Sequence, residues 1–448
     1  MRIPKGVPSR NFAGARTFPS AATPDFHTIR NTNSKPEHIP SLLRTGKSAR
    51  HGATISKWAR WREELNGVRG LLGVALWLCL QPSPLFGAQN ITNEPPKQER
   101  WFHYTNDINE DVPLSIHIVR VERARHDFEF CTTLGKGNAV GMAIVSQQVK
   151  LLPADCGQPL AAINGDFYEK SEKYLGRARD LQIYFGEVIS TPAGHTCFWM
   201  DTDGTPHMTN VFSRFRVIWP DGKTTPIGLN QLREDDAAVL YTSVTGSSTR
   251  TSGGSDLILE HSTNSPWLPL KIGQTYTARV REVRTPGDAP ITHETMVLSI
   301  GPTLVGRVPA LRAGATLQIV TETFPDLSGA EVAIGGGPTL VQDGKPMQWP
   351  GFIHMRHPRS ALGWNNDYIF MVEVDGRQSN LSLGMTFPEL ASYLIKLGCS
   401  QAMNFDGGGS ATLWALGAVR NSPSEGDERP SANALVLLKK KPAPAPAH

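Results

Sequence analysis

The densest set of reactive side chains lies in residues 404–410, which read Asn-Phe-Asp-Gly-Gly-Gly-Ser. An apolar run precedes them, so we expect a strand that ends in the Asp406 carboxylate at a sheet edge. Glycines have no Cβ, and successive glycine N–H groups can surround an anion such as a phosphate. A tight turn with a solvated aspartate is the simpler interpretation of Asp-Gly. The three glycines, followed by Ser410 and Thr412, favour a binding site for an anion over a simple turn.

Two further segments show a strand that ends in polar residues beside glycine. Asn164 and Asp166 flank a glycine after one apolar run, and Glu373, Asp375 and Arg377 stand at the end of another. Glu373 and Asp375 are two residues apart and therefore lie on the same face of their strand. One such end is ordinary, whereas three predict a shared site.

Carboxylates in such a site support different kinds of chemistry. Two of them can flank a sugar bond as general acid and as nucleophile or base, and we assign Asp406 and Glu373 to this role with Asp375 in support. Carboxylates at one edge can instead hold Ca²⁺ or Mg²⁺, although nothing in the sequence requires a cofactor and no metal ligand is assigned. A buried structural acid at Glu373 and a turn residue at Asp166 are the alternatives.

Arginines near these strand ends could bind phosphate, because a guanidinium fork matches two phosphate oxygens. Arg359 is the best placed and Arg377 the second, and either could instead pair with a neighbouring carboxylate. His354 and His357 could be metal ligands, proton shuttles or ordinary loop residues. We assign binding of the substrate or its phosphate to Asn164, Asp166, Arg359, Arg377, Gly407, Gly408, Gly409, Ser410 and Thr412.

The elements that must position these residues read as strand 368–375, helix 387–397 and strand 399–405. Thr386 and Glu389 form a capping box at the start of the helix. Such a crossover connects parallel strands, so Asp375 and Asp406 should share one crevice. We predict an α/β (mixed α+β) fold, with a mixed sheet, a C-terminal βαβ unit and strand-rich insertions.

Charge and composition exclude some functions for this chain of 448 residues. Residues 1–70 hold 13 Lys and Arg against 4 Asp and Glu, so the rest holds 32 basic and 37 acidic residues. A nucleic-acid-binding body is therefore not indicated. We expect one domain over residues 98–438 and a disordered tail over 439–448.

The N-terminal part predicts export. Residues 71–80 form an apolar run of signal-peptide length, too short to span a bilayer, so we predict a signal peptide over 68–88 and no stable membrane span. Residues 1–67 are a disordered basic extension or a mis-called start. The protein is then periplasmic or extracellular. In that setting the remaining cysteines could form two disulfides or stay free: Cys131, Cys156, Cys197 and Cys399.

Taken together and in order, these motifs resemble the phosphodiester glycosidase family. The final element is specific, and the others gain weight from their order. The resemblance spans about residues 105–438 and rests on Ala162–Phe167, Leu240–Thr242, Gly336–Gly344, Pro358–Gly363, Val374–Arg377, Ser382–Thr386 and Asn404–Ser410.

The resemblance implies a hydrolase for glycosyl phosphodiesters. We expect an exported enzyme that cleaves an N-acetylglucosamine-like 1-phosphodiester, with a polysaccharide or glycosyl phosphodiester substrate and a role in envelope or exopolysaccharide metabolism. One alternative is a metal-dependent phosphodiesterase that breaks the P–O bond. Another is a cell-envelope glycan-binding module without catalysis. The sequence does not distinguish the three.

Overall fold

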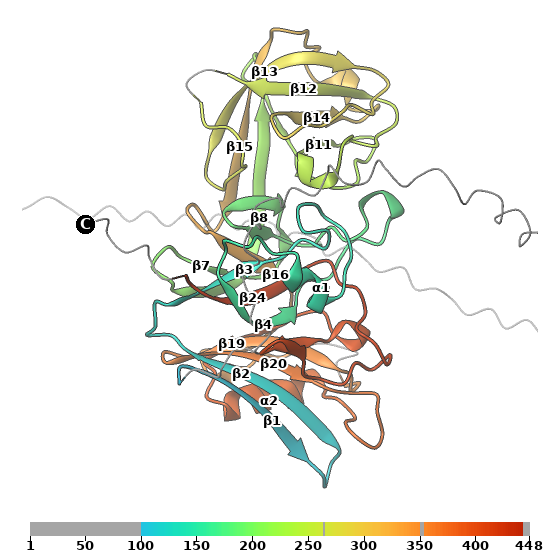
Figure 1. Ribbon diagram of the computed structural model, residues 1–448. Coiled ribbons are helices and arrows are strands. Elements are labelled where there is room, and N and C mark those ends of the chain that lie inside the picture. The colour runs from blue at the N-terminus through green and yellow to red at the C-terminus, as the bar shows by residue number, and fades with distance from the viewer. Residues whose placement is uncertain (1–99, 263–264, 350–353, 442–448) are drawn as a thin grey trace, which may run out of the picture. The chain divides into compact units, whose positions relative to one another are not determined.

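The described part of the chain is built mainly from β-strands in this computed structural model, which covers residues 100–262, 265–349 and 354–441 (Figure 1). All of these residues belong to one unit, 91–448. The predicted extension, the predicted signal peptide and residues 442–448 of the predicted tail lie outside the described residues. Strand β24 continues to Lys439, where that tail was expected to begin.

A seven-stranded sheet carries most of the predicted site. Its strands pair antiparallel throughout. In spatial order they are β1 (Phe102–Asn109), β2 (Leu114–Glu122), β20 (Tyr368–Val374), β19 (Arg359–Trp364), β21 (Gln401–Asn404), β17 (Thr339–Gln342) and β18 (Lys345–Pro346).

The predicted α/β class is wrong, and β19 is the physical reason. The strand–helix–strand order is present, with α2 (Phe387–Lys396) between β20 and β21. However, β19 pairs antiparallel with both strands and lies between them. A short turn joins β19 to β20, and this hairpin occupies the edge of β20 before the chain returns from the helix. The strands β20 and β21 therefore run in the same direction without pairing, and the sheet is antiparallel.

Helix α2 begins where its sequence predicts. Thr386 is the N-cap, its hydroxyl accepts from the Glu389 amide, and the Glu389 carboxylate accepts from the Thr386 amide. This capping box satisfies two amides that the first helical turn leaves open. Leu390 and Leu394 point from α2 onto the sheet and pack there with Val372 of β20. The predicted helix and its cap are confirmed.

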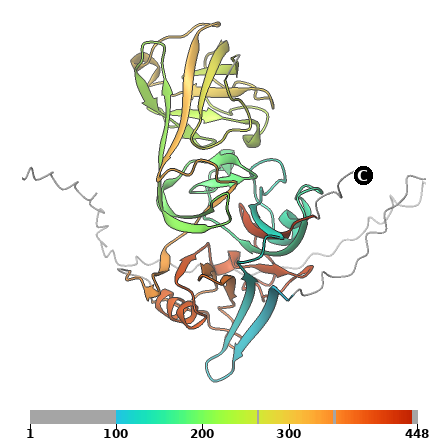
Figure 2. The same ribbon diagram turned by 90° about the vertical axis from the view of Figure 1, so that its left-hand side faces the viewer.

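The opposite face of the seven-stranded sheet packs on a five-stranded sheet. Met371 and Leu362 contribute to this interface from one side, and Ile163 and Leu435 from the other. Because α2 covers one face and the second sheet covers the other, β20 is apolar on both faces (Figure 2). The five strands are, in order, β23 (Ala418–Val419), β22 (Leu413–Ala415), β4 (Gln158–Asn164), β24 (Ala434–Lys439) and β3 (Phe128–Thr132).

A twelve-stranded sheet accounts for the strand-rich middle of the chain, and the short helix α1 (Val145–Lys150) packs on the five-stranded sheet. The long strand β8 runs from β7 to the group β11–β15 (Figure 1), and one apolar cluster extends from β5 and β7 into that group. In spatial order, the strands of the twelve-stranded sheet are β10 (Gly228–Leu229), β11 (Ala238–Tyr241), β14 (Met296–Ile300), β12 (Ser255–His261), β13 (Thr275–Arg284), β15 (Thr316–Phe324), β8 (Pro206–Ile218), β7 (Ala193–Met200), β16 (Val332–Gly335), β5 (Gln182–Tyr184) and β6 (Glu187–Ser190), with β9 (Thr224–Pro226) beside β8.

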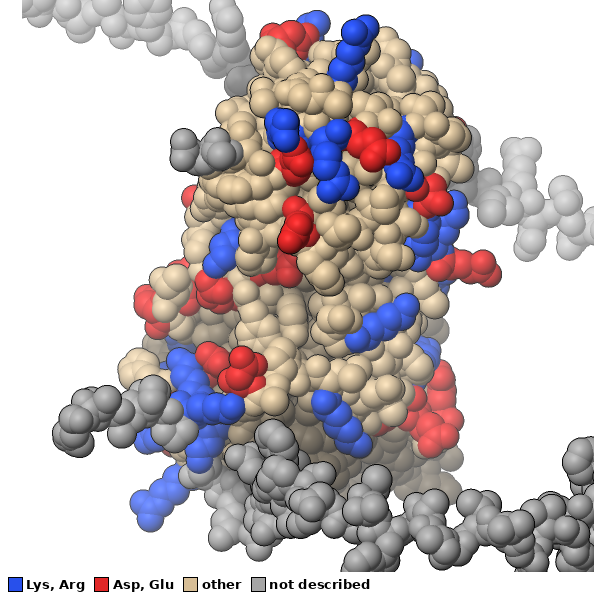
Figure 3. Space-filling view, turned by 45° about the horizontal axis from the view of Figure 1, so that its top comes forward, with Lys and Arg blue, Asp and Glu red and all other residues tan. Residues whose placement is uncertain are grey.

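Surface charge in this region is paired. Arg216 contacts Glu322, Arg279 contacts Glu260, and both pairs lie on neighbouring strands. The face turned to the viewer in Figure 3 shows basic and acidic side chains interspersed. All four described cysteines are free thiols, so the two-disulfide alternative does not hold.

Candidate functional site

Two of the acidic strand ends lie at the same edge of the seven-stranded sheet. Strands β20 and β21 run in the same direction on either side of β19, so Asp375 and Asp406 follow strand ends at one edge. Arg359 begins β19 between them and pairs with Val374. The Gly408 amide donates to the Pro358 carbonyl at 2.9 Å, which holds the glycine loop beside the start of β19. The two carboxylates nevertheless occupy different surroundings.

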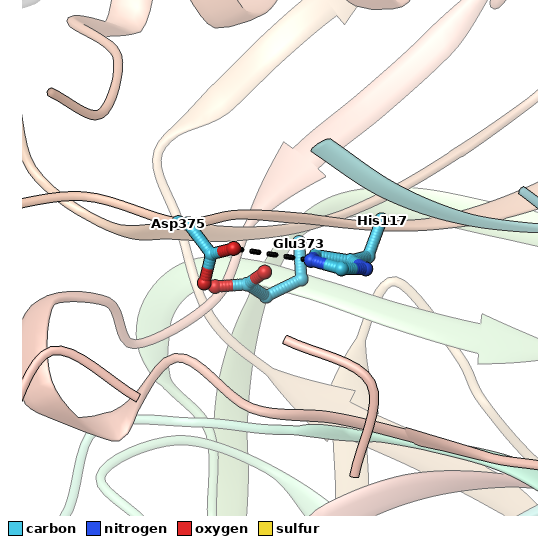
Figure 4. Close-up of side chains that lie close together, drawn as sticks. All are labelled: His117, Glu373 and Asp375. Atoms are coloured by element: carbon cyan, nitrogen blue, oxygen red, sulfur yellow. Dashed lines mark hydrogen bonds and ion pairs between the residues drawn. The ribbon is translucent and has the colours of Figure 1, made fainter. Parts of the chain in front are cut away.

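Asp375 belongs to a buried cluster with Glu373 and His117. His117 stands directly opposite Glu373 across the β2–β20 pair, and Asp375 is two residues further on the same face. The His117 Nε2 atom lies 3.1 Å from Asp375 Oδ2. Figure 4 shows the Glu373 carboxyl group beside that of Asp375, with the His117 ring next to both. All three side chains are less than 5% exposed, so the cluster has no open face.

The Glu373 carboxyl group has an unusual environment for an acid. Burial raises its pKa well above the ordinary value, and the neighbouring Asp375 raises it further. The Asn421 amide lies close enough to lower that pKa somewhat, but it bonds to the backbone of Leu413 and Ala411. Within the described chain, neither Glu373 oxygen has a hydrogen-bond partner of normal geometry. The protonated form of Glu373 is therefore favoured.

Hydrogen-bond partners orient the remaining two members of this cluster. The Tyr104 hydroxyl lies 2.9 Å from Nδ1 of His117. The Ser422 amide donates to Asp375 Oδ1 at 2.7 Å. The Ser115 hydroxyl is 3.2 Å from His117 Nε2. These contacts fix the ring and one carboxylate, whereas Glu373 is left without a comparable donor.

Asn164 ties the strand ends together and does not face an open surface. Its amide donates to the Asp406 carbonyl, and its oxygen accepts from the Ser360 hydroxyl and the Thr412 amide. Asn164 and Thr412 are fully buried, as is Ser410, whose hydroxyl accepts from Arg429. The structure thus shows these three predicted substrate-binding residues as supports of the Asp406 loop.

The three glycines do not form the expected cradle of free amides. The Gly407 amide donates to Asp406 Oδ1 and the Gly408 amide to the Pro358 carbonyl, so two of the three are engaged. Backbone contact and conformation explain two of the glycines instead. A Cβ on Gly407 would lie 2.8 Å from the Pro358 carbonyl oxygen, and Gly408 has φ +63°, which side chains rarely adopt.

Two predicted arginines meet beside this loop. The Arg359 guanidinium is largely buried, stacks 4.1 Å above the Phe387 ring centroid and donates to the Met385 and Met355 carbonyls. Burial, and then Arg377, lower the pKa of Arg359 to about 10. Arg377 is exposed and approaches His357. Burial lowers the pKa of His357, and the positive charges of Arg359 and Arg377 lower it further. Neither arginine pairs with a carboxylate in the described residues, so their positive charge is uncompensated.

Asp406 is half-buried and lies among cations. Burial raises its pKa, while the Ser410 hydroxyl, Arg429 and Lys170 oppose that rise. Its amide donates to the Gly165 carbonyl at 2.9 Å, which brings the loop against the end of β4. Asp406 is therefore more accessible than Glu373 and Asp375.

Asp166 belongs to a separate group around Asp180. Asp166 Oδ2 accepts from the Asp180 amide at 2.7 Å, and Asp180 contacts Arg179 and His195. Burial, together with the negative charge of Asp180, raises the pKa of Asp166 to about 8. Asp166 is almost fully buried. The predicted contact between Asp166 and a substrate is therefore indirect at most, through the neighbouring Arg179.

A cleft of about 570 Å³ opens between these groups, a volume within the usual range for small-molecule sites. Gly337 forms part of its lining and donates to the Asn404 carbonyl at the end of β21. Asn404 is two residues before Asp406 in the sequence, but Asp406, Arg359 and Arg377 are not among the residues that line this cleft. Its lining combines polar and aromatic residues: Phe167, Arg179, His195, Thr196, Asn210, Gly336, Gly337, Pro338, Thr339, Met347, Gln348, Trp349 and Phe387.

Sequence reasoning missed several of these residues. His117 belongs to none of the motifs, and its partner Asp375 is 258 residues away. Arg179 and His195 likewise belong to no motif, and only the fold brings them to the cleft. Arg429 was in a segment with no motif. Only His117 could have been found from the sequence, because it is a polar residue on the same strand face as Val119 and Val121.

Comparison with known proteins identifies the C-terminal part of the chain. Residues 274–438 match the model of the phosphodiester glycosidase family, which confirms the resemblance drawn from the motifs. The SPbeta prophage-derived uncharacterized protein YomE of Bacillus subtilis (strain 168) is 34% identical over 114 residues, which are 24% of this chain and 18% of that protein. The chain thus spans under a fifth of that relative.

Solved structures share the fold. A hypothetical protein from Synechocystis superposes with a TM-score of 0.58 at 18% identity, over 75% of this chain and 61% of that one. A candidate exported protein from Burkholderia pseudomallei K96243 gives a TM-score of 0.56 at 20% identity, over 73% and 74% of the chains. Among the described residues, no helix has the length and apolarity needed to cross a bilayer.

Proposed function

Since residues 274–438 match the phosphodiester glycosidase family, we propose that this protein hydrolyses a glycosyl 1-phosphodiester, with an N-acetylglucosamine-like sugar, at the Asp406 loop. The observation that carries the proposal is the pair of arginines without carboxylate partners in the described residues, Arg359 and Arg377, which lie against the glycine loop that follows the half-buried Asp406. Uncompensated guanidinium groups attract a phosphodiester. The carboxylate next to them is then in reach of the sugar.

The proposed chemistry breaks the bond between the anomeric carbon and the phosphate oxygen. Asp406 acts on the anomeric carbon as a nucleophile, or on a water molecule as a base. The group that departs is a phosphate monoester, a good leaving group, so a single carboxylate suffices. Arg377 and Arg359 stabilise the negative charge that develops on the departing phosphate. The aromatic lining of the cleft, Trp349 and Phe387, offers apolar faces to the sugar.

Glu373 and Asp375 do not take part directly in this proposal. Both are fully enclosed, so a substrate cannot touch them without a change in the cluster. The expected pair of catalytic carboxylates is replaced here by Asp406, supported by Ser410 and Arg429. Asn164 keeps a positioning role, because its amide holds the Asp406 carbonyl.

The test compares Asp406→Asn with Asp367→Asn. The substrate is an N-acetylglucosamine 1-(methyl phosphodiester), and release of the free sugar is followed. Asp367 is exposed in the β19–β20 turn and serves as a matched control. We expect turnover to fall by about 10³-fold in Asp406→Asn and to stay near wild-type in Asp367→Asn. Near-wild-type turnover in Asp406→Asn removes the proposed role, and tight glycan binding without turnover by the wild type favours a binding module.

We also propose export and a role in envelope or exopolysaccharide metabolism. The apolar run at residues 71–80 supports export, as its length suits a signal peptide. N-terminal sequencing of the protein from a native host tests this proposal. We expect cleavage near residues 86–88 and recovery outside the cytoplasm, and an uncleaved cytoplasmic chain contradicts it.

A further inference from the structure

The His117–Glu373–Asp375 cluster has the chemistry of a metal site. The ligand atoms of its three residues all lie within 4.8 Å of one another, and His117 Nε2 is 3.1 Å from Asp375 Oδ2. Neighbouring ligands of one metal ion are separated by about 3 Å when each bond is near 2.1 Å. The present spacing therefore needs only small side-chain movements to close around an ion.

We propose that His117, Glu373 and Asp375 bind one divalent transition-metal ion, of the Mn²⁺ or Zn²⁺ class, between the two sheets. This site is separate from the Asp406 loop and does not depend on the proposed hydrolysis. The strand register builds it. His117 and Glu373 are opposite each other in β2 and β20, and Asp375 follows on the same face.

Glu373 supplies a second, independent observation. It is fully buried, and within the described chain both of its oxygens lack a hydrogen-bond partner. Figure 4 shows the carboxyl group of Glu373 directed toward Asp375, next to the His117 ring. Burying an unpaired carboxylate is costly, and a cation between the two acids removes that cost. The orphaned group is thus aimed at the place where an ion would lie.

The surroundings suit a metal-binding histidine. The Tyr104 hydroxyl holds Nδ1 of His117 at 2.9 Å, which leaves Nε2 directed at Asp375. A hydrogen bond to the second ring nitrogen fixes the orientation of most metal-ligating histidines. The Ser422 amide holds the other oxygen of Asp375 at 2.7 Å. The Ser115 hydroxyl, 3.2 Å from Nε2, is close enough to complete the coordination.

The donor set decides the class of ion. One imidazole nitrogen and two carboxylates suit Mn²⁺, Fe²⁺, Co²⁺ and Zn²⁺, whereas Ca²⁺ and Mg²⁺ prefer oxygen ligands alone. Two carboxylates with a neutral imidazole give a charge of −2, which a divalent ion neutralises. The Ca²⁺ or Mg²⁺ considered from the sequence is therefore the less suitable choice for this cluster.

The test uses the full chain, stripped with a chelator and then titrated with Co²⁺, Zn²⁺, Mn²⁺ or Mg²⁺. We expect about one Zn²⁺ or Co²⁺ per chain by elemental analysis, a rise in Tm with either ion, and visible Co²⁺ absorption bands. Mg²⁺ should have little effect. Glu373→Gln should weaken Zn²⁺ binding by at least tenfold and abolish the Tm shift, with an unchanged circular dichroism spectrum.

The matched control is Asp201→Asn, because Asp201 forms an exposed histidine–carboxylate pair with His207. This variant should keep full Zn²⁺ binding, and a loss there would place the ion at the surface and overturn the proposal. The Co²⁺ spectrum of the wild-type chain needs no variant, so the test stands even if Glu373→Gln fails to fold. Absent bands together with no Tm shift overturn the metal site and leave a proton shared between Glu373 and Asp375.

Discussion

Two strand ends of one sheet have similar sequences and different environments. Asp375 and Asp406 each follow an apolar strand and precede a glycine, and both lie at the same edge. Asp375 lies beside Glu373 and His117 beneath the five-stranded sheet, with almost no exposed surface. Asp406 also touches that sheet through the Gly165 carbonyl at the end of β4, but its side chain is only half-buried, near Arg429 and the glycine loop. The strand motif alone therefore does not tell a buried acid cluster from an accessible carboxylate. The contacts that each side chain makes in the fold decide.

The largest expected difference between the two ends is catalytic. Asp406→Asn should reduce turnover by about 10³-fold and leave the free energy of unfolding nearly unchanged, because the half-buried side chain contributes little to packing. Asp375→Asn should instead lower the free energy of unfolding, since Asp375 accepts from Ser422 and contacts His117. Urea unfolding and steady-state kinetics on both variants check this. If the two variants show the same profile, the contrast between the strand ends fails.

A second difference concerns the arginines beside Asp406. Arg377→Gln should raise KM for the phosphodiester by roughly 10-fold, equivalent to about 1.4 kcal/mol, because one charged contact to the phosphate is lost. Arg284 is an exposed arginine on β13 that pairs with Glu282, and Arg284→Gln is the control. Inhibition by inorganic phosphate, measured for both variants, checks the same site. An unchanged KM in Arg377→Gln would show that Arg377 does not contact the phosphate of the substrate.

The acidic group near the cleft gives a pH-dependent prediction. The pKa of Asp166 is raised to about 8 by burial and by Asp180, from 3.8 in the unfolded chain. The folded state therefore keeps a proton that the unfolded state releases. The stability from this group is complete below about pH 4 and is lost as pH rises toward 8, a change of a few kcal/mol in total.

Asp166→Asn removes this proton, so the fall in unfolding free energy between pH 5 and pH 8 should become shallower. The amide oxygen can still accept from the Asp180 backbone, which preserves the local geometry. Urea unfolding at the two pH values compares the wild type, Asp166→Asn and the exposed control Asp367→Asn. An identical pH dependence in all three would show that Asp166 is ionised in the folded protein.

The smallest expected effect is at the helix cap. Thr386→Ala should lower the free energy of unfolding by about 1 kcal/mol, because the Thr386 hydroxyl accepts from the Glu389 amide. Turnover should stay within twofold of the wild type, because the Phe387 ring and the Met385 carbonyl on either side of Thr386 keep their contacts with Arg359. A large loss of activity in this variant would show that the cap is needed to hold Phe387 in the lining of the cleft.

Local patterns were predicted well and long-range pairings were not. The helix over 387–396 and its cap follow from Thr386, Pro388 and Glu389, which act within one turn. The common edge for Asp375 and Asp406 also follows from the strand–helix–strand order. The antiparallel sheet could not be predicted in this way. It depends on the insertion of β19 between β20 and β21, and no local pattern in 359–364 specifies those partners.

The site residues divide in the same manner. Arg359 and the Asp406 loop lie in sequence motifs, and these motifs were enough to predict them as site residues. The use of the Gly408 amide by Pro358, however, depends on a contact across 50 residues. His117 could not be assigned from its strand alone, because its role comes from Asp375 on a distant strand. Residues whose chemistry depends on a partner far along the chain are the ones that require the structure.

The central claim is that the Asp406 loop breaks a sugar C–O bond. Hydrolysis of an N-acetylglucosamine 1-(methyl phosphodiester) by the wild-type protein in ¹⁸O-labelled water tests it most directly, with mass spectrometry of both products. The account predicts that the label enters the released sugar and that the phosphate remains unlabelled. Label in the phosphate product would contradict it, because the P–O bond would then be the one that breaks.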